Sequence, residues 1–185
     1  MEVLLMKEAR NIVLTGFMGT GKTSVGKTLA EWVTFDFADM DAVIEKEEGK
    51  TVPEIFAGKG EAYFRKVESE VAQRLAKGNK QVIATGGGTV KDPKNMEALR
   101  EAGIVVCLTA SVDTILQRTA AEGERPLLDA AGDDRRAAVE KLLAEREALY
   151  KDADYVIDTD GKTPDDVAGE IFSRFEMDSV MLPSF

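Results

Sequence analysis

Residues 16–23 bring glycines, a lysine and a threonine together at a spacing that suits phosphate binding. They match the pattern G-x-x-x-x-G-K-[ST]. Glycines let successive backbone N–H groups face one anion, Lys22 can reach the β- and γ-phosphates of a nucleotide, and the Thr23 hydroxyl can bind Mg²⁺. A strand-like apolar run at 11–15 precedes the loop and a helical pattern at 23–33 follows it. These flanks favour a nucleotide-binding loop, with a helix N-terminus behind it, over a plain glycine-rich turn.

Two more candidate ligand-binding segments follow expected strands. Asp39 and Asp41 come directly after the expected strand 34–38. One of these carboxylates can hold Mg²⁺ while the other accepts a proton from a substrate hydroxyl. The alternative for the pair is an ordinary helix N-cap at Asp41. Residues 86–88 are three glycines that allow a ligand to approach the backbone closely, or else form a mobile turn.

Three arginines complete the set of candidate groups. Arg65, Arg125 and Arg146 each lie in a polar segment, and each by itself is most often a solvated surface charge. The chain has no histidine, so imidazole acid–base chemistry and Ser-His-Asp triads are excluded.

The elements that must position these residues alternate between strands and helices. The expected strands are 11–15, 34–38, 82–85, 104–108 and 155–158, and the expected helices are 23–33, 42–48, 61–77, 93–102, 111–119, a stretch ending at 150, and 163–175. Residues 51–54 have the form of a capping box. The pattern predicts the α/β class, a three-layer sandwich around a central five-stranded parallel sheet.

Composition limits the partners. The 185 residues fit one domain, and a net charge of −10 argues against general nucleic-acid binding. No apolar run approaches the roughly 20 residues of a membrane span, and the first residues do not resemble a signal peptide. The one cysteine, Cys107, lies in an apolar run, so we expect a buried thiol and a cytoplasmic protein.

In combination these motifs resemble the shikimate kinase family. The phosphate loop, D-x-D, F-R-x-x-E (64–68), G-G-G, R-P-L-L (125–128) and R-x-x-L-Y (146–150) occur in that order, and the resemblance covers residues 12–175. It implies a phosphate-loop, nucleoside-monophosphate-kinase-like fold that transfers the γ-phosphoryl group of ATP to the 3-hydroxyl of shikimate. Members often have glycine where this chain has Thr34, which is a detail of a turn.

The resemblance also implies roles for single residues. ATP would be bound by Gly19, Thr20, Gly21, Lys22, Thr23, Ser24, Arg118, Arg125 and Pro164. Shikimate would be bound by Asp41, Arg65, Gly87, Gly88 and Arg146, with the two arginines on its carboxylate. Catalysis would rest on Lys22, on Asp41 as the base and on Arg125 from a lid. Mg²⁺ would be held by Thr23 and, through water, by Asp39. Phe56 and Phe64 match apolar pocket walls, although core packing explains them equally well.

The resemblance divides the single domain into a core (11–38, 72–118 and 137–175), a substrate-binding helical segment (39–71) and a lid (119–136). Residues 176–185 form a tail without a clear pattern and are expected to be disordered. ATP and shikimate are the expected partners, with no nucleic acid or membrane, and we expect a monomer.

Three other functions remain as alternatives. A different small-metabolite kinase on this fold, such as a gluconate kinase, is disfavoured by R-P-L-L and the triple glycine. A GTPase should carry [NT]-K-x-D, and the segment 79–82 lacks the aspartate. A catalytically silent nucleotide-binding module is disfavoured because Lys22, Thr23, Asp39 and Asp41 are all present.

Overall fold

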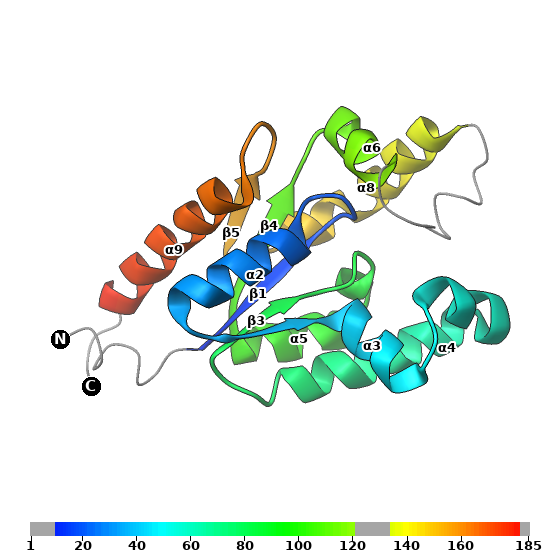
Figure 1. The fold of residues 1–185 in the computed structure, drawn as a ribbon, viewed down its shortest axis with the longest axis horizontal. Coiled ribbons are helices and arrows are strands. Elements are labelled where there is room, and N and C mark those ends of the chain that lie inside the picture. Colours follow the sequence, from blue (N-terminus) through cyan, green and yellow to red (C-terminus); the bar gives the residue numbers. More distant parts are fainter. Residues whose placement is uncertain (1–9, 121–133, 182–185) are drawn as a thin grey trace.

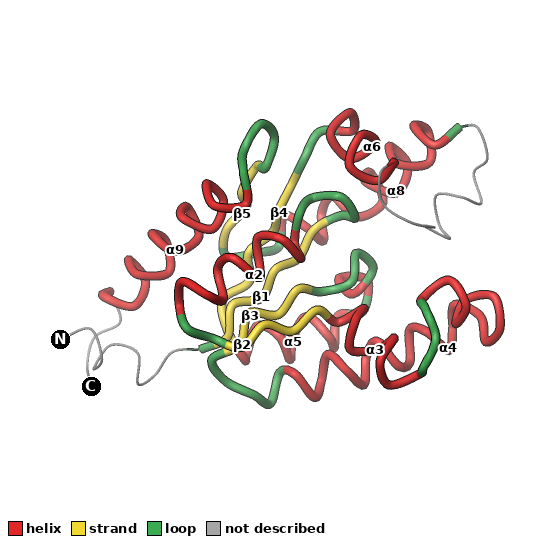
Figure 2. Tube along the Cα trace, in the orientation of Figure 1, coloured by secondary structure: helices red, strands yellow, loops and turns green. Residues whose placement is uncertain are grey.

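A parallel β-sheet forms the centre of the structure, a computed structural model that describes residues 10–120 and 134–181, with side chains up to residue 175. Five strands lie side by side in the order β2-β3-β1-β4-β5 (Figure 2). They are β1 (Asn11–Gly16), β2 (Asp36–Asp39), β3 (Gln81–Ala84), β4 (Gly103–Thr109) and β5 (Tyr155–Asp158). Since every neighbouring pair is parallel, all the strands end at one edge of the sheet. The predicted α/β class and strand count are confirmed.

Helices cover both faces of this sheet (Figure 1). They are α2 (Lys22–Val33), α3 (Met40–Glu48), α4 (Val52–Leu75), α5 (Pro93–Ala102), α6 (Val112–Ala120), α8 (Arg135–Lys151) and α9 (Pro164–Met181). Side chains alternate between the faces along each strand. Ile12 and Leu14 of β1 therefore pack in a core with α2 and α9, while Val13 packs in a second core with α4, α5 and α8. The three layers follow directly from this alternation.

Cys107 of β4 belongs to the second core and is fully buried, as the sequence predicted. Burial raises the pKa of its thiol, although a hydrogen bond with Thr15 and the charge of Lys22 oppose the change. Among the described residues, no helix is long and apolar enough to cross a membrane.

Several element boundaries differ from the prediction. Strand β2 begins at Asp36 instead of residue 34, because Thr34 caps α2 in the left-handed conformation (φ 56°). The capping box of Thr51 and Glu54 is confirmed, but the helix it opens continues past a break at Gly60 (φ 81°, ψ 167°) as α4. Helix α9 runs on to Met181, although the sequence predicted that this helix ends at residue 175.

Replacing Thr34 with glycine is expected to stabilise the protein by about 1 kcal/mol. A residue with a β-carbon is strained in the left-handed conformation, and the exposed Thr34 lies in it. For a chain of this size the melting temperature should rise by roughly 2–4 °C in a thermal unfolding experiment. Thr28→Gly, inside α2, is the control and should lower the melting temperature instead. A lower melting temperature for Thr34→Gly would contradict the strain argument.

Two groups of helices extend past the edge where the strands end (Figure 1). Helices α3 and the first part of α4 lie on one side, and α6 lies on the other. Most of the segment predicted as a lid, including Arg125, lies outside the described residues. The remaining predicted site residues all lie at this edge or in the helices beside it.

Candidate active site

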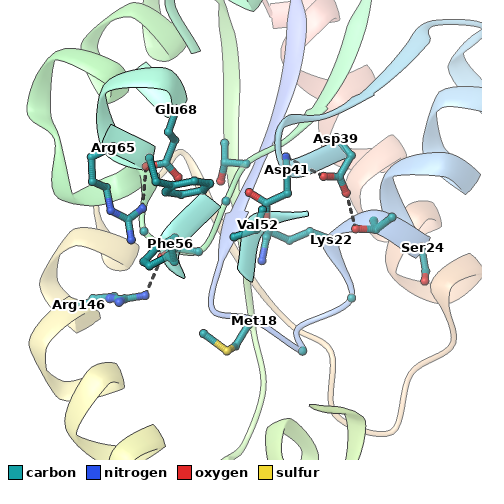
Figure 3. A pocket seen from close by; sticks show the side chains of 18 residues that line it. Met18, Lys22, Ser24, Asp39, Asp41, Val52, Phe56, Arg65, Glu68 and Arg146 are labelled. Atoms are coloured by element: carbon teal, nitrogen blue, oxygen red, sulfur yellow. Dashed lines mark hydrogen bonds and ion pairs between the residues drawn. The ribbon is translucent and has the colours of Figure 1, made fainter. Parts of the chain in front are cut away.

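A pocket at this edge of the sheet brings most of the predicted site residues together (Figure 3). The lining includes Gly19, Gly21, Lys22, Thr23, Ser24, Asp39, Asp41, Arg65, Gly87, Gly88 and Arg146. In Figure 3, Arg65 and Arg146 lie on one side, Asp39 and Ser24 lie on the other, and Asp41 is placed between them. Residues from widely separated parts of the chain thus form one two-sided site.

The loop between β1 and α2 has the form of an anion cradle. Gly16 (φ 134°) and Gly21 (φ 91°) have backbone conformations that favour glycine. No side chain caps the N-terminus of α2, so its first N–H groups face the loop without a side-chain acceptor. Lys22 Nζ lies over the loop and donates hydrogen bonds to Gly16 O and Phe17 O, both at 2.9 Å. The Thr20 hydroxyl is buried and donates to Phe17 O at 2.8 Å, and the Thr20 backbone N–H donates to the same oxygen at 3.4 Å.

The two residues predicted beside adenine line a second hollow. Arg118 and Pro164 both line it, and the hollow shares Gly19, Gly21 and Ser24 with the first pocket. The Arg118 guanidinium donates to Gly19 O at 3.2 Å and to Thr159 O at 3.1 Å. It therefore ties the loop to the end of β5. A nucleotide lying along the loop would have one end in each hollow.

The two aspartates after β2 have different surroundings. Asp39 caps α3, since its Oδ1 accepts the N–H groups of Asp41 at 3.0 Å and Ala42 at 3.2 Å. The alternative of an N-cap at Asp41 was therefore wrong. The Asp41 carboxylate lines the pocket, and its Oδ1 would lie 3.0 Å from a Cβ at Gly86.

Thr23 and Asp39 can together hold a cation. Thr23 Oγ1 donates to Asp39 Oδ2 at 2.6 Å beside the phosphate loop. A hydroxyl and a carboxylate oxygen this close suit Mg²⁺, which takes few protein ligands alongside waters and substrate phosphates. Among the residues described, no three or more acidic, Cys or His side chains are arranged so that they could hold a metal ion together. The protein's share of such a site would be these two side chains.

The triple glycine makes space for charged side chains. None of Gly86, Gly87 and Gly88 has a positive φ. A Cβ at Gly86 would lie 2.6 Å from Glu68 Oε1, and one at Gly88 would lie 2.5 Å from Arg65 Nη1. Both distances are too short for a real Cβ contact, so a side chain at either position would have to displace the Glu68 carboxylate or the Arg65 guanidinium from its present place.

Arg65 is held between two carboxylates. Its Nη1 donates to Glu68 Oε2 at 2.7 Å, while Nε and Nη2 both donate to Glu61 Oε1 at 3.2 Å. Glu68 is only 2% exposed and also accepts a hydrogen bond from the Thr89 hydroxyl at 2.8 Å. Burial alone would lower the pKa of the Arg65 guanidinium, but the charges and hydrogen bonds of Glu68 and Glu61 outweigh it and raise the pKa. Arg65 is therefore a fixed positive charge.

Arg146 reaches the pocket from α8 and is 3% exposed. Its Nη1 donates to Gly87 O at 2.9 Å, and its guanidinium carbon lies 5.7 Å from the centre of the Phe17 ring. Its buried Nε has no hydrogen-bond partner among the described residues. A buried donor of this kind is costly unless something accepts from it, as an anionic ligand in the pocket would.

Apolar side chains complete the pocket beside the arginines. The rings of Phe56 and Phe64 lie 4.9 Å apart, and both residues line the pocket with Val52. Phe64 also belongs to the second core, so the two roles expected from the sequence, pocket wall and core residue, are compatible.

Sequence reasoning gave no role to three of the residues that shape this site. Glu68 and Tyr150 were quoted only within motifs, and Thr89, which donates a hydrogen bond to Glu68, was not considered. The spacing of Glu68 three residues after Arg65 was the available signal, because such pairs share a helix face.

Comparisons with known proteins point to one family. The family model described as shikimate kinase matches residues 18–176. A shikimate kinase of Thermodesulfovibrio yellowstonii is 46% identical over 167 residues, covering 90% of this chain and 95% of that protein. One from Geobacter sulfurreducens is 48% identical over 164 residues, covering 89% and 90%.

A solved structure gives the same result at the level of the fold. The structure of a shikimate kinase from Acinetobacter baumannii in complex with shikimate matches with a TM-score of 0.89 and 38% identity. The match covers 94% of this chain and 96% of that one. With the family model spanning most of the sequence, these likenesses lead to one conclusion: the chain belongs to the shikimate kinase family.

Proposed function

We propose that this chain transfers the γ-phosphoryl group of ATP to the 3-hydroxyl of shikimate. The observation that carries the proposal is the single pocket in which the phosphate loop faces Asp41 and two arginines. ATP would lie along residues 19–24 and extend towards Arg118 and Pro164. Shikimate would occupy the opposite side, beside Phe56, Phe64 and the triple glycine.

The two arginines supply the recognition of the acceptor. Shikimate carries a carboxylate, and a guanidinium binds a carboxylate through paired hydrogen bonds that a lysine cannot match. Arg65 is held in place by Glu68, and Arg146 is held by Gly87 O. The backbone of Gly87 and Gly88 would position the ring between them.

The chemical step would be a direct displacement. The shikimate hydroxyl oxygen attacks the γ-phosphorus, the bond from that phosphorus to the bridging oxygen of ADP breaks, and the hydroxyl proton passes to the Asp41 carboxylate. Lys22 would balance the charge on the β- and γ-phosphates. Thr23 and Asp39 would hold Mg²⁺, which neutralises phosphate charge when it is bound. We further propose that α3 and α4 form the acceptor-binding segment. The protein would be a monomer and would act in the cytoplasm.

A panel of ADP-release assays tests the proposal. Purified enzyme with Mg²⁺ and ATP is given shikimate, gluconate or no acceptor, and ADP is measured over time. We expect release with shikimate far above that in the other two tubes. Equal release in all three would contradict a shikimate kinase, and release only with gluconate would favour the alternative metabolite kinase.

Arg65→Ala is expected to raise the KM for shikimate about 10- to 150-fold, because a hydrogen bond to a charged group is worth roughly 1.5–3 kcal/mol. The KM for ATP should change little, since Arg65 lies on the acceptor side of the pocket. Steady-state kinetics with each substrate varied in turn measures both constants.

Arg74→Ala is the matched control, because Arg74 lies on the same helix and pairs with Glu47 outside the pocket. Arg65→Lys keeps a positive charge near the buried Glu68, which separates loss of binding from loss of folding. A defect in Arg65→Ala mainly on the ATP side would refute the role in carboxylate binding.

A further inference from the structure

Tyr150 lies one helical turn after Arg146 on α8, and both side chains reach the same atom. The Tyr150 hydroxyl donates to Gly87 O at 2.7 Å, and Arg146 Nη1 donates to it at 2.9 Å. Tyr150 is 5% exposed and is not part of the pocket lining, whereas Gly87 and Arg146 are. A residue outside the pocket thus holds two residues that line it.

We propose that Tyr150 is a positioning residue for acceptor binding, which acts by fixing the Gly87 carbonyl and, through it, the Arg146 guanidinium. The inference rests on the proposed function, because Arg146 and Gly87 are assigned there to shikimate. Tyr150 itself does not contact the substrate. Its hydroxyl determines the positions of the Gly87 carbonyl and the Arg146 guanidinium, which belong to the residues assigned to shikimate.

The hydrogen-bond geometry supports this role. A carbonyl oxygen has two lone pairs, and at Gly87 one accepts from tyrosine and the other from arginine. Because the guanidinium is planar, fixing Nη1 also limits the directions in which Nε and Nη2 can point. The buried Nε, which lacks a partner among the described residues, is then oriented by the same bond.

Without the hydrogen bond from Tyr150, the Gly87 carbonyl would keep only the hydrogen bond from Arg146 among those that the structure describes. Gly87 itself has no side chain that could anchor the loop. Next to it, Gly88 leaves space for Arg65, so the same short backbone segment is in contact with both arginines. A movement of the Gly87 carbonyl would therefore disturb both groups that recognise the acceptor.

The hydroxyl is suited to act as a permanent donor. Burial raises the pKa of Tyr150 to about 12, although the charge of Arg146 and a hydrogen bond with it act in the opposite direction. The group stays protonated throughout the neutral range and cannot lose its proton to the medium there.

Tyr150→Phe tests the inference because it removes one O–H group and keeps the ring. The KM for shikimate should rise about 3- to 10-fold, which corresponds to the loss of one hydrogen bond, while the KM for ATP stays within about twofold. The dissociation constant of shikimate, measured by calorimetry, should rise by a similar factor. Tyr155→Phe, on the edge strand β5, is the matched control and should change neither constant.

A double-mutant cycle separates positioning from general packing. In an Arg146→Ala background, Tyr150→Phe should change kcat/KM for shikimate by a clearly smaller factor than in the wild type, because one of the two groups that Tyr150 positions is gone. An unchanged KM for shikimate in Tyr150→Phe, equal rises in both KM values, or a full effect in the Arg146→Ala background would each overturn the inference. A wild-type chain without shikimate-dependent ADP release would overturn the proposed function instead.

Discussion

Replacing Lys22 with methionine is expected to lower kcat for shikimate phosphorylation by a factor on the order of 10²–10³, the usual effect of removing one group that stabilises transition-state charge. Phosphoryl transfer depends on positioning and charge neutralisation more than on covalent chemistry. Lys22 Nζ lies over the phosphate loop within 2.9 Å of two of its carbonyl oxygens. Methionine has a similar length but supplies no charge. ADP release at saturating ATP and shikimate measures the change.

Lys27→Met is the control for this prediction. Lys27 lies on the same helix, is exposed and is not part of the pocket lining. The Lys27→Met variant should retain wild-type kcat, which would show that removing a lysine from α2 is not harmful in itself. A Lys22 variant with more than a tenth of wild-type kcat would contradict the assigned role, provided that both variants melt as the wild type does.

Asp41→Asn is expected to lower kcat roughly 10²–10⁴-fold, the range that general-base catalysis contributes. Asparagine keeps the shape of the side chain but cannot take up the proton of the attacking hydroxyl. The backbone N–H of Asp41 would still donate to Asp39, so the cap of α3 should survive. Measuring kcat with both substrates saturating separates this loss from weaker binding.

Asp36→Asn provides the matched comparison for Asp41. Asp36 begins strand β2, which leads to Asp41, but it is exposed and lies at the opposite end of that strand, so its variant should behave as the wild type. If Asp41→Asn raises the KM for shikimate while kcat stays within tenfold, Asp41 only positions the hydroxyl and is not the base.

The sequence predicted the order and type of elements well because local signals are strong in this chain. The alternation of strands and helices, the capping box at Thr51 and the proline helix starts all depend on residues close together along the chain. The boundaries at Thr34 and Gly60 were less predictable. A threonine in the left-handed conformation goes against its own preference, and here it closes α2 through backbone hydrogen bonds from Thr34 N to Ala30 O and Glu31 O; a glycine can either continue a helix or break it.

The triple glycine shows the limit of sequence reasoning about the site. From sequence, these glycines suggested an exposed backbone for a ligand. In the structure they also leave space for Glu68 and Arg65, which come from a helix some twenty residues earlier. Similarly, Asp39 and not Asp41 caps α3, because Asp39 Oδ1 lies over the first N–H groups of that helix.

By itself the sequence predicted a phosphate-binding loop at residues 16–23, because that loop is a local structure whose geometry follows from its own residue types. With the resemblance, it also named the acceptor and the residues expected to bind it. Only the tertiary structure decided how those residues are held: Thr89 donates to the Glu68 carboxylate that pairs with Arg65, and Tyr150 shares the Gly87 carbonyl with Arg146. The reason is that these contacts join α4, α8 and the loop after β3, and burial, which sets their strength, arises only when those elements pack together.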